Sequence, residues 1–174
     1  MALVVNLQRK IKLDPKQFTD FTQQLSASVD EARDGDFSVA FVSDRRMTEL
    51  NSFFRDKQTT TDVLSFPHEA DEFESKSYAS TRETTPSAEA VATPLQTVGE
   101  LLTPEGVTLA FLGDIVISVE QAQRQAKENG LTLEDEIKQL ILHGLLHLCG
   151  YDHETDGGKM SKRELQLRRH LKIE

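Results

Sequence analysis

Three histidines in the stretch HGLLHLCGYDH, residues 143–153, are the side chains of this sequence best suited to chemistry. His143 and His147 are four positions apart, which places both on one face of a helix about one turn apart. Gly150 can adopt a positive φ, end that helix and turn the chain so that His153 returns to the same point. Three neutral imidazoles with an open fourth position are typical of a catalytic zinc site. The spacing therefore predicts a metal site on a helix and the turn that follows it.

The same spacing occurs in metzincin proteases, whose pattern H-E-x-x-H-x-x-G-x-x-H differs from this sequence at one position. Gly144 stands where those proteases have the glutamate that acts as general base. A glycine cannot accept a proton from water, and inside a helix it costs about 1 kcal/mol relative to alanine. We therefore expect another helix or the substrate to approach closely at Gly144. We expect no peptide hydrolysis by the standard mechanism of zinc proteases.

Three further polar side chains near these histidines have other expected roles. Cys149 lies two residues beyond His147, about 200° around the helix, and is expected to pack in the core rather than to bind metal. Asp152 precedes His153 and is a candidate either to orient that histidine or to cap the turn. Asp114 either supports the site or has a structural role in its strand.

The elements that position the histidines follow from hydrophobic periodicity and capping residues. Alternating apolar residues predict strands at 3–7, 37–43, 62–66 and 111–118. Helical spacing predicts helices from Asp14-Pro15 to about Val29, from Ser43 or Asp44 through Phe54, over about 118–129, over about 133–149, and from Gly158 to about Leu171. This order predicts an α+β, zincin-like domain with a four-stranded mixed sheet and about five helices.

Charge is distributed unevenly along the 174 residues. The net charge of −9 argues at first against a nucleic-acid partner, but residues 69–105 carry −6 of it. Those residues contain ten Ser or Thr and three Pro, which predicts a mostly disordered acidic insertion within a single domain 1–174. The remaining −3 is compatible with a basic patch. Its candidates are Arg45, Arg46, Arg55, Lys57, Lys162, Arg163, Arg168 and Arg169.

Cysteine content and hydropathy indicate the compartment. The single cysteine excludes an intrachain disulfide and fits a reducing environment. The first residues lack the apolar core of a signal peptide, and no window approaches about 18 consecutive apolar residues. We therefore expect a cytoplasmic protein without a membrane-spanning segment.

Three motifs of the sequence resemble those of one known family. HGLLHLCGYDH is similar to the H-G-x-L-H-L-x-G-Y-D-H signature of the YbeY endoribonuclease family. LNSFFRDKQTTTDVLSFP, residues 50–67, and LGDIVIS, residues 112–118, resemble two further motifs of that family. The resemblance extends over the chain except residues 69–105, where the family usually has a much shorter link.

This resemblance implies a site and an activity. It implies zinc bound by His143, His147 and His153, and a catalytic role for Arg55. It further implies a single-strand-specific endoribonuclease that acts in maturation of small-subunit ribosomal RNA and in ribosome quality control, with ribosomal RNA and the small ribosomal subunit as partners. The acidic insertion departs from the family pattern. It either screens the site from non-specific RNA or is a solvated linker without effect.

The chemistry that such a site would perform has two possible routes. Zinc held by three imidazoles lowers the pKa of bound water to about 7, which would allow attack on a phosphodiester or removal of a 2′-hydroxyl proton. Arg55 suits the role that the resemblance implies because a guanidinium pairs two phosphoryl oxygens and stays protonated, although a surface salt bridge is its alternative. Imidazole also suits nickel and other transition metals.

Two other functions are compatible with parts of the sequence. A metalloendopeptidase-like hydrolase is suggested by the metzincin spacing, but it lacks the base. A non-catalytic ribosome-associated factor with structural zinc is suggested by the acidic charge and by the insertion, which would serve for docking.

Overall fold

One mixed sheet forms the centre of the protein. The computed structural model describes residues 3–32, 35–68 and 111–173, so the predicted insertion 69–105 lies outside the described residues. The strands are β1 (Leu3–Asn6), β2 (Asp36–Val42), β3 (Val63–Pro67) and β4 (Phe111–Ser118). Their order is β1-β2-β4-β3. β1, β2 and β4 are parallel, whereas β3 runs antiparallel to β4, which confirms the mixed sheet.

Five α-helices accompany the sheet in the part of the chain that is described. They are α1 (Lys16–Ser28), α2 (Asp44–Arg55), α4 (Val119–Asn129), α5 (Leu133–Leu148) and α6 (Lys159–Leu171), with a 3-10 helix at Asp30–Ala32. The α+β class is confirmed, and the observed ends lie within two residues of the predicted ones. Local capping explains this agreement, since Ser43, Ser118 and Thr132 each accept a hydrogen bond from a backbone N–H three residues later.

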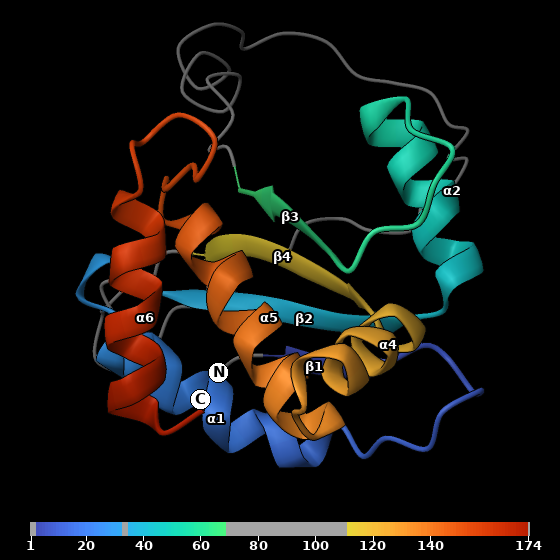
Figure 1. Ribbon diagram of the computed structural model, residues 1–174, viewed down its shortest axis with the longest axis horizontal. Helices are drawn as coiled ribbons and strands as arrows, with labels where there is room; N and C mark the ends of the chain where they lie inside the picture. The colour runs from blue at the N-terminus through green and yellow to red at the C-terminus, as the bar shows by residue number, and fades with distance from the viewer. Residues whose placement is uncertain (1–2, 33–34, 69–110, 174) are drawn as a thin grey trace, which may run out of the picture. The chain divides into compact units, whose positions relative to one another are not determined.

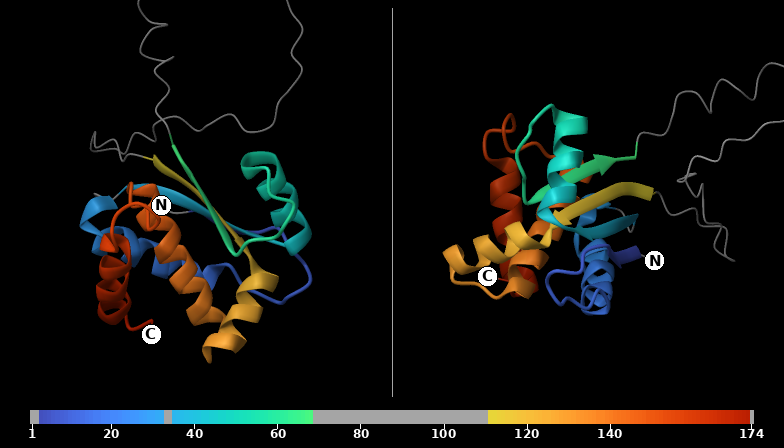
Figure 2. Two further views of the ribbon diagram at one scale, coloured as in Figure 1. Left: turned by 45° about the horizontal axis from the view of Figure 1, so that its top comes forward. Right: turned by 90° about the vertical axis from the view of Figure 1, so that its right-hand side faces the viewer.

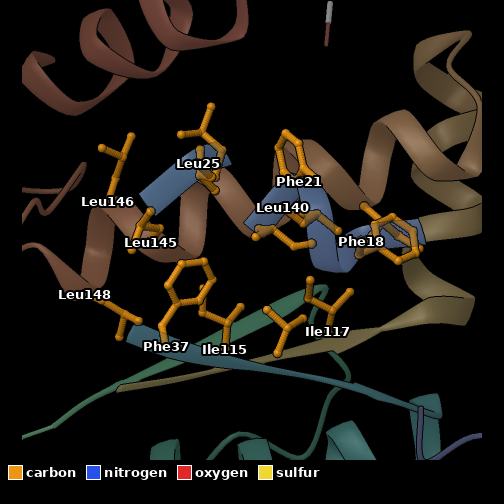
Figure 3. Packing of buried hydrophobic residues seen from close by; sticks show 14 of the residues in the cluster. Phe18, Phe21, Leu25, Phe37, Ile115, Ile117, Leu140, Leu145, Leu146 and Leu148 are labelled. Atoms are coloured by element: carbon orange, nitrogen blue, oxygen red, sulfur yellow. The ribbon is translucent and has the colours of Figure 1, made fainter. Parts of the chain in front are cut away.

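The main hydrophobic core lies between α5 and one face of the sheet. Figure 1 shows α5 between α4 and α6, with the sheet behind these three helices. Figure 3 shows Leu145 of α5 near Phe37 of β2 and Ile115 of β4, with Phe18 and Phe21 of α1 at the other end of the cluster. Because α5 is apolar on most sides, it is buried among the other elements, and only a narrow strip is available for polar side chains.

A smaller cluster occupies the opposite face of the sheet. Val42, Met47, Leu64 and Val116 form it, and Met47 comes from α2. In Figure 2, left, β3 and β4 separate α2 from α5 and α6. The two clusters follow from the alternation of side chains along each strand. None of the described helices combines the length and apolar character needed to cross a bilayer.

Candidate metal centre

The end of α5 brings the histidines together. Gly150 has φ +91°. Its N–H donates to the carbonyl of His147 at 3.0 Å, and the N–H of Tyr151 donates to the carbonyl of Leu146 at 3.1 Å. This pair of hydrogen bonds is a Schellman motif, which requires a left-handed residue at the position of Gly150. The predicted turn is confirmed, and it directs the chain back toward α5.

Asp152 shapes the turn that carries His153. Its carboxylate accepts hydrogen bonds from the backbone N–H of Glu154 at 3.1 Å and from the hydroxyl of Thr155 at 2.8 Å. The hydrogen bond from Thr155 is the main reason that the pKa of Asp152 is lowered. Of the two roles expected for Asp152, the structure assigns it the cap of the turn.

The ring nitrogens of the three histidines converge. Nε2 of His147 lies 3.2 Å from Nε2 of His143 and 3.1 Å from Nδ1 of His153. One nitrogen from each ring lies within 4.8 Å of the other two. His143 and His147 are half-buried, whereas His153 is exposed. The predicted cluster is therefore present, with an open side toward solvent.

Hydrogen bonds on the outer side of two rings determine which nitrogens carry protons. Nδ1 of His147 lies 2.9 Å from the carbonyl oxygen of Tyr151, which can only accept, so this Nδ1 must carry the hydrogen. Nδ1 of His143 lies 3.1 Å from a carboxylate oxygen of Glu164. In the neutral rings both Nε2 atoms then present lone pairs to each other. Two such lone pairs repel unless a cation or a proton lies between them, and these residues therefore fit a metal ion.

Burial favours the neutral ring at His147. It lowers the pKa of that imidazole, and the neighbouring His143 lowers it further. Metal ligation requires the deprotonated nitrogen, so the same environment that disfavours a proton favours a metal ion.

The partners of the histidines are themselves anchored. Glu164 of α6 accepts a hydrogen bond from Arg168, one helical turn later. Burial raises the pKa of Glu164, but its hydrogen bond with His143 and the charge of Arg168 outweigh this effect, so the net pKa is lowered. Glu164 is thus a carboxylate that orients the ring of His143 and increases the basicity of its Nε2.

A second anchor holds the turn after α5. The hydroxyl of Tyr151 donates to Glu31 at 2.8 Å. Arg163 of α6 donates to both oxygens of Glu31, at 3.0 and 2.9 Å. The hydrogen bond from Arg163 is the main cause that lowers the pKa of Glu31 to about 2. The carbonyl of Tyr151 contacts His147, and its hydroxyl contacts Glu31. Tyr151 is therefore connected through Glu31 to the 3-10 helix and to α6.

A polar cavity of about 200 Å³ is lined by His143 together with residues of α4, α5 and α6. Gln125 and Arg168 are among its lining residues, and Oε1 of Gln125 and Nε of Arg168 are buried without a hydrogen-bond partner among the described residues. The remaining lining residues are Asp62, Asn129, Glu136, Gln139 and Leu140.

Comparison with known proteins identifies the family. The family model described as endoribonuclease YbeY matches residues 3–172. The chain belongs to the endoribonuclease YbeY family.

Several proteins named endoribonuclease YbeY are similar to this chain. The one from Nautilia profundicola is 37% identical over 140 residues, covering 80% of this chain and 75% of the relative. The one from Syntrophus aciditrophicus is 32% identical, and the match covers 96% of this chain and 88% of the relative. The one from Aquifex aeolicus is 34% identical, and the match covers 95% of this chain and 86% of the relative. The solution structure of a Thermotoga maritima protein matches with a TM-score of 0.53 at 25% identity, covering 95% of this chain and 85% of that one.

Gly144, which departs from the protease pattern, is explained by packing in this YbeY chain. A Cβ at this position would lie 2.8 Å from Cγ2 of Ile115, a fully buried residue of β4. The expected close approach is confirmed, but the neighbour is the strand β4 and not the helix or substrate that was expected. A glutamate would have no room here, so the protease base is sterically excluded as well as absent.

Two other side chains singled out in the sequence lie away from the histidine nitrogens. Cys149 packs against the main core, as expected, and burial raises the pKa of its thiol to about 11. Asp114 accepts a hydrogen bond from Ser38 of the adjacent strand, which is the structural role of the two considered.

Arg55, the catalytic residue that the YbeY resemblance implies, is not in contact with the histidines. It is the last residue of α2 and is exposed. α2 packs on the sheet face opposite to α5, and β3 lies between them. Arg55 forms no ion pair with any described residue, which leaves its guanidinium available to a ligand.

The eight candidate residues do not form one basic patch, so this interpretation of the sequence is wrong. Four belong to α2 and the loop after it, and four belong to α6, on the other side of the sheet. Several are also paired, since Arg45 and Arg46 contact Glu49, while Arg163 and Arg168 contact Glu31 and Glu164. Each paired guanidinium has its charge offset locally.

Sequence reasoning missed Glu164, Tyr151 and Glu31. Glu164 stands among basic residues of α6, 21 positions from His143, and nothing local marks it as a partner of that ring. Tyr151 and Glu31 are 120 positions apart. The only usable signal was general: histidine ligands usually donate their second N–H to a carboxylate or a carbonyl.

Proposed function

We propose that this YbeY-family chain is a zinc-dependent endoribonuclease that cleaves single-stranded RNA during maturation of small-subunit ribosomal RNA in the cytoplasm. The proposal of a metal site rests on one observation. The outer hydrogen bonds of His143 and His147 direct both Nε2 lone pairs at one point beside His153. The reaction class, cleavage of RNA, is inferred from the name endoribonuclease that the relatives bear. The small ribosomal subunit is the partner that the motif resemblance implies.

Different residues would bind the metal ion and orient the histidine rings. His143, His147 and His153 would hold the ion, and Glu164 with the carbonyl of Tyr151 would keep the first two rings in the required tautomer. Zinc supplies a Lewis acid that brings the pKa of water near 7. The exposed side of the cluster at His153 admits the substrate.

Arg55 is proposed to bind the phosphoryl group. A guanidinium stays protonated and pairs two oxygens, so it stabilises the negative charge that builds up during phosphodiester cleavage. Because β3 lies between α2 and α5, the side chain would have to act from across this edge strand. The RNA strand itself would bridge the two sides.

The two other functions make different predictions. Peptide hydrolysis is disfavoured by the crowding at Gly144, and digestion of casein with and without chelator should give no products. A non-catalytic protein with structural zinc should unfold on chelation, whereas an open catalytic site on a packed α5 should leave most of the stability intact.

The test combines metal analysis with RNA cleavage. Purified protein should contain about one zinc ion per chain, and His147→Ala should lose both the metal and the cleavage. Arg55→Ala should keep the metal and lose most of the cleavage. Arg45→Ala is the matched control, because it removes an exposed arginine of the same helix. Cleavage that persisted in both His147→Ala and Arg55→Ala would refute the proposal.

A further inference from the structure

Two phenylalanines at the end of α2 are exposed although they are large and apolar. Phe53 is 80% exposed and Phe54 is 56% exposed. Their ring centroids lie 4.9 Å apart, and the ring of Phe54 lies 4.9 Å from that of Phe66 in β3. The three rings therefore form a continuous aromatic run from the tip of α2 to the edge strand of the sheet.

Phe53 and Phe54 belong to the last turn of α2, and hydrogen bonds from Asn51 join this turn to the loop that follows it. The side chain of Asn51 donates to the carbonyl of Thr59 at 2.7 Å, and the N–H of Lys57 donates to the carbonyl of Asn51 at 3.3 Å. Asn51 itself is buried. A shallow groove of about 550 Å³ lies beside Phe53. A surface that is already ordered loses little conformational entropy on binding.

Two exposed cations follow these phenylalanines in the sequence. Arg55 and Lys57 are exposed and form no ion pair with a described residue, unlike Arg45 and Arg46 of the same helix. Exposed aromatic faces beside unpaired cations are the combination that binds single-stranded nucleic acid, because bases stack on the rings while the cations contact the phosphates.

One strand, β3, lies between the aromatic run and the histidine cluster. Ser65, next to Phe66, donates from its hydroxyl to the carbonyl of Gly144 at 3.3 Å, and Gly144 is adjacent to His143. β3 pairs with β4 alone among the described strands and is an edge of the sheet. An RNA strand that starts on α2 therefore needs to cross only β3 to reach the ring nitrogens.

We propose that Phe53 and Phe54 form a stacking platform for unpaired bases of single-stranded RNA. It holds the strand beside Arg55 and directs it across β3 to the histidine cluster. This proposal rests on the proposed endoribonuclease function and names the surface that selects unpaired RNA. Bases within a duplex are stacked on each other and cannot stack on the platform.

The chain contains no tryptophan, which allows a direct test. Phe53→Trp introduces a single indole, and stacking of a base on it quenches its fluorescence. Titration with a single-stranded oligouridine of about 12 nucleotides should quench Phe53→Trp but not the control Leu165→Trp, which places the indole at an exposed apolar position of α6. A double-stranded RNA of the same length should quench far less. Absence of quenching, or equal quenching by duplex, would overturn the platform.

Affinity measurements separate stacking from apolar contact. Phe53→Ala should weaken oligouridine binding by about fivefold or more, Phe53→Leu should behave like Phe53→Ala, and Phe53→Trp should retain binding. Wild-type affinity in Phe53→Leu would show that the ring face is not used. Unchanged oligouridine binding in Phe53→Ala, combined with lost co-sedimentation with ribosomes, would assign the surface to a protein partner.

The same experiment distinguishes failure of the platform from failure of the proposed function. If wild-type protein cleaves RNA and Phe53 variants bind and cleave normally, the platform alone is refuted. If Phe53→Trp is quenched by single-stranded RNA but the metal-loaded wild type never cleaves, the platform stands and the proposed reaction is refuted.

Discussion

Nδ1 of His143 lies 3.1 Å from Oε2 of Glu164, a residue 21 positions later in the sequence. This contact joins α5 to α6 at the histidine cluster. It directs the free nitrogen of His143 toward His147 and His153, because the other nitrogen is occupied by the carboxylate. The packing of α6 against α5 is therefore a condition for the geometry of the site.

Replacing this carboxylate should weaken metal binding without loss of the fold. Glu164→Gln removes the negative charge beside His143 while keeping the size of the side chain, so zinc affinity should fall by about tenfold or more. Competition with a chromophoric chelator measures this change. Glu134→Gln is the control, since Glu134 pairs with Lys138 within α5. Equal affinity in both variants would contradict the role assigned to Glu164.

The ion pair at Glu31 should make stability depend on pH. The folded-state pKa of about 2 lies below the usual 4.5, so the stabilisation is complete above about pH 4.5 and is lost as the pH falls toward 2. Glu31→Gln should lower the free energy of unfolding by on the order of 2 kcal/mol at pH 7, and by progressively less in more acidic solution. Urea unfolding at pH 7 and pH 3 tests this.

Asp30 offers the matched control for that experiment. Its side chain is 94% exposed and lies 3.5 Å from the guanidinium of Arg163. Because solvent screens such a contact, Asp30→Asn should change the unfolding free energy little at either pH. An equal loss in Asp30→Asn and Glu31→Gln would mean that net charge, rather than the part-buried hydrogen bonds of Glu31, stabilises this region.

The contact between α5 and β4 should not tolerate even a methyl group at Gly144. Gly144→Ala places Cβ 2.8 Å from Cγ2 of Ile115 and should destabilise the protein by about 1–3 kcal/mol. In an Ile115→Ala background the same change should cost much less, because the conflicting atoms are gone. A double-mutant cycle by urea unfolding measures the coupling. Strict additivity would exclude Ile115 as the cause.

The acidic segment should be removable. Pro67 of β3 pairs with Gly113 of β4, and the N–H of His68 donates to the carbonyl of Leu112 at 2.9 Å, so the strand ends are adjacent. Replacing residues 69–110 by a short glycine-containing turn should preserve the fold, measured by circular dichroism and thermal unfolding.

The same shortened chain tests the electrostatic role of the segment. Residues 69–105 carry −6 of the net −9. Their removal should tighten binding of single-stranded RNA at low salt, with the difference vanishing at high salt. Unchanged affinity at every salt concentration would identify the segment as a solvated linker.

Much of the architecture was predictable because its causes are local. Apolar residues at helical spacing mark α5, Thr132 caps it, and Gly150 ends it. The spacing of His143 and His147 on that helix, followed by the turn, therefore predicted the cluster itself. Each of these signals depends on residues within one or two turns of each other.

The tertiary structure decided which side chains meet across elements. Periodicity shows that a helix has an apolar face, but it does not specify which partner covers that face. Only packing brought Glu164 to His143 and Ile115 to Gly144. Packing also put α2, with Arg55, on the other face of the sheet from α6, which divided a basic patch that composition alone had suggested. The sequence by itself determined which three histidines come together, because their spacing is local, whereas the docking of α6 on α5 determined the hydrogen bond that orients the ring of His143.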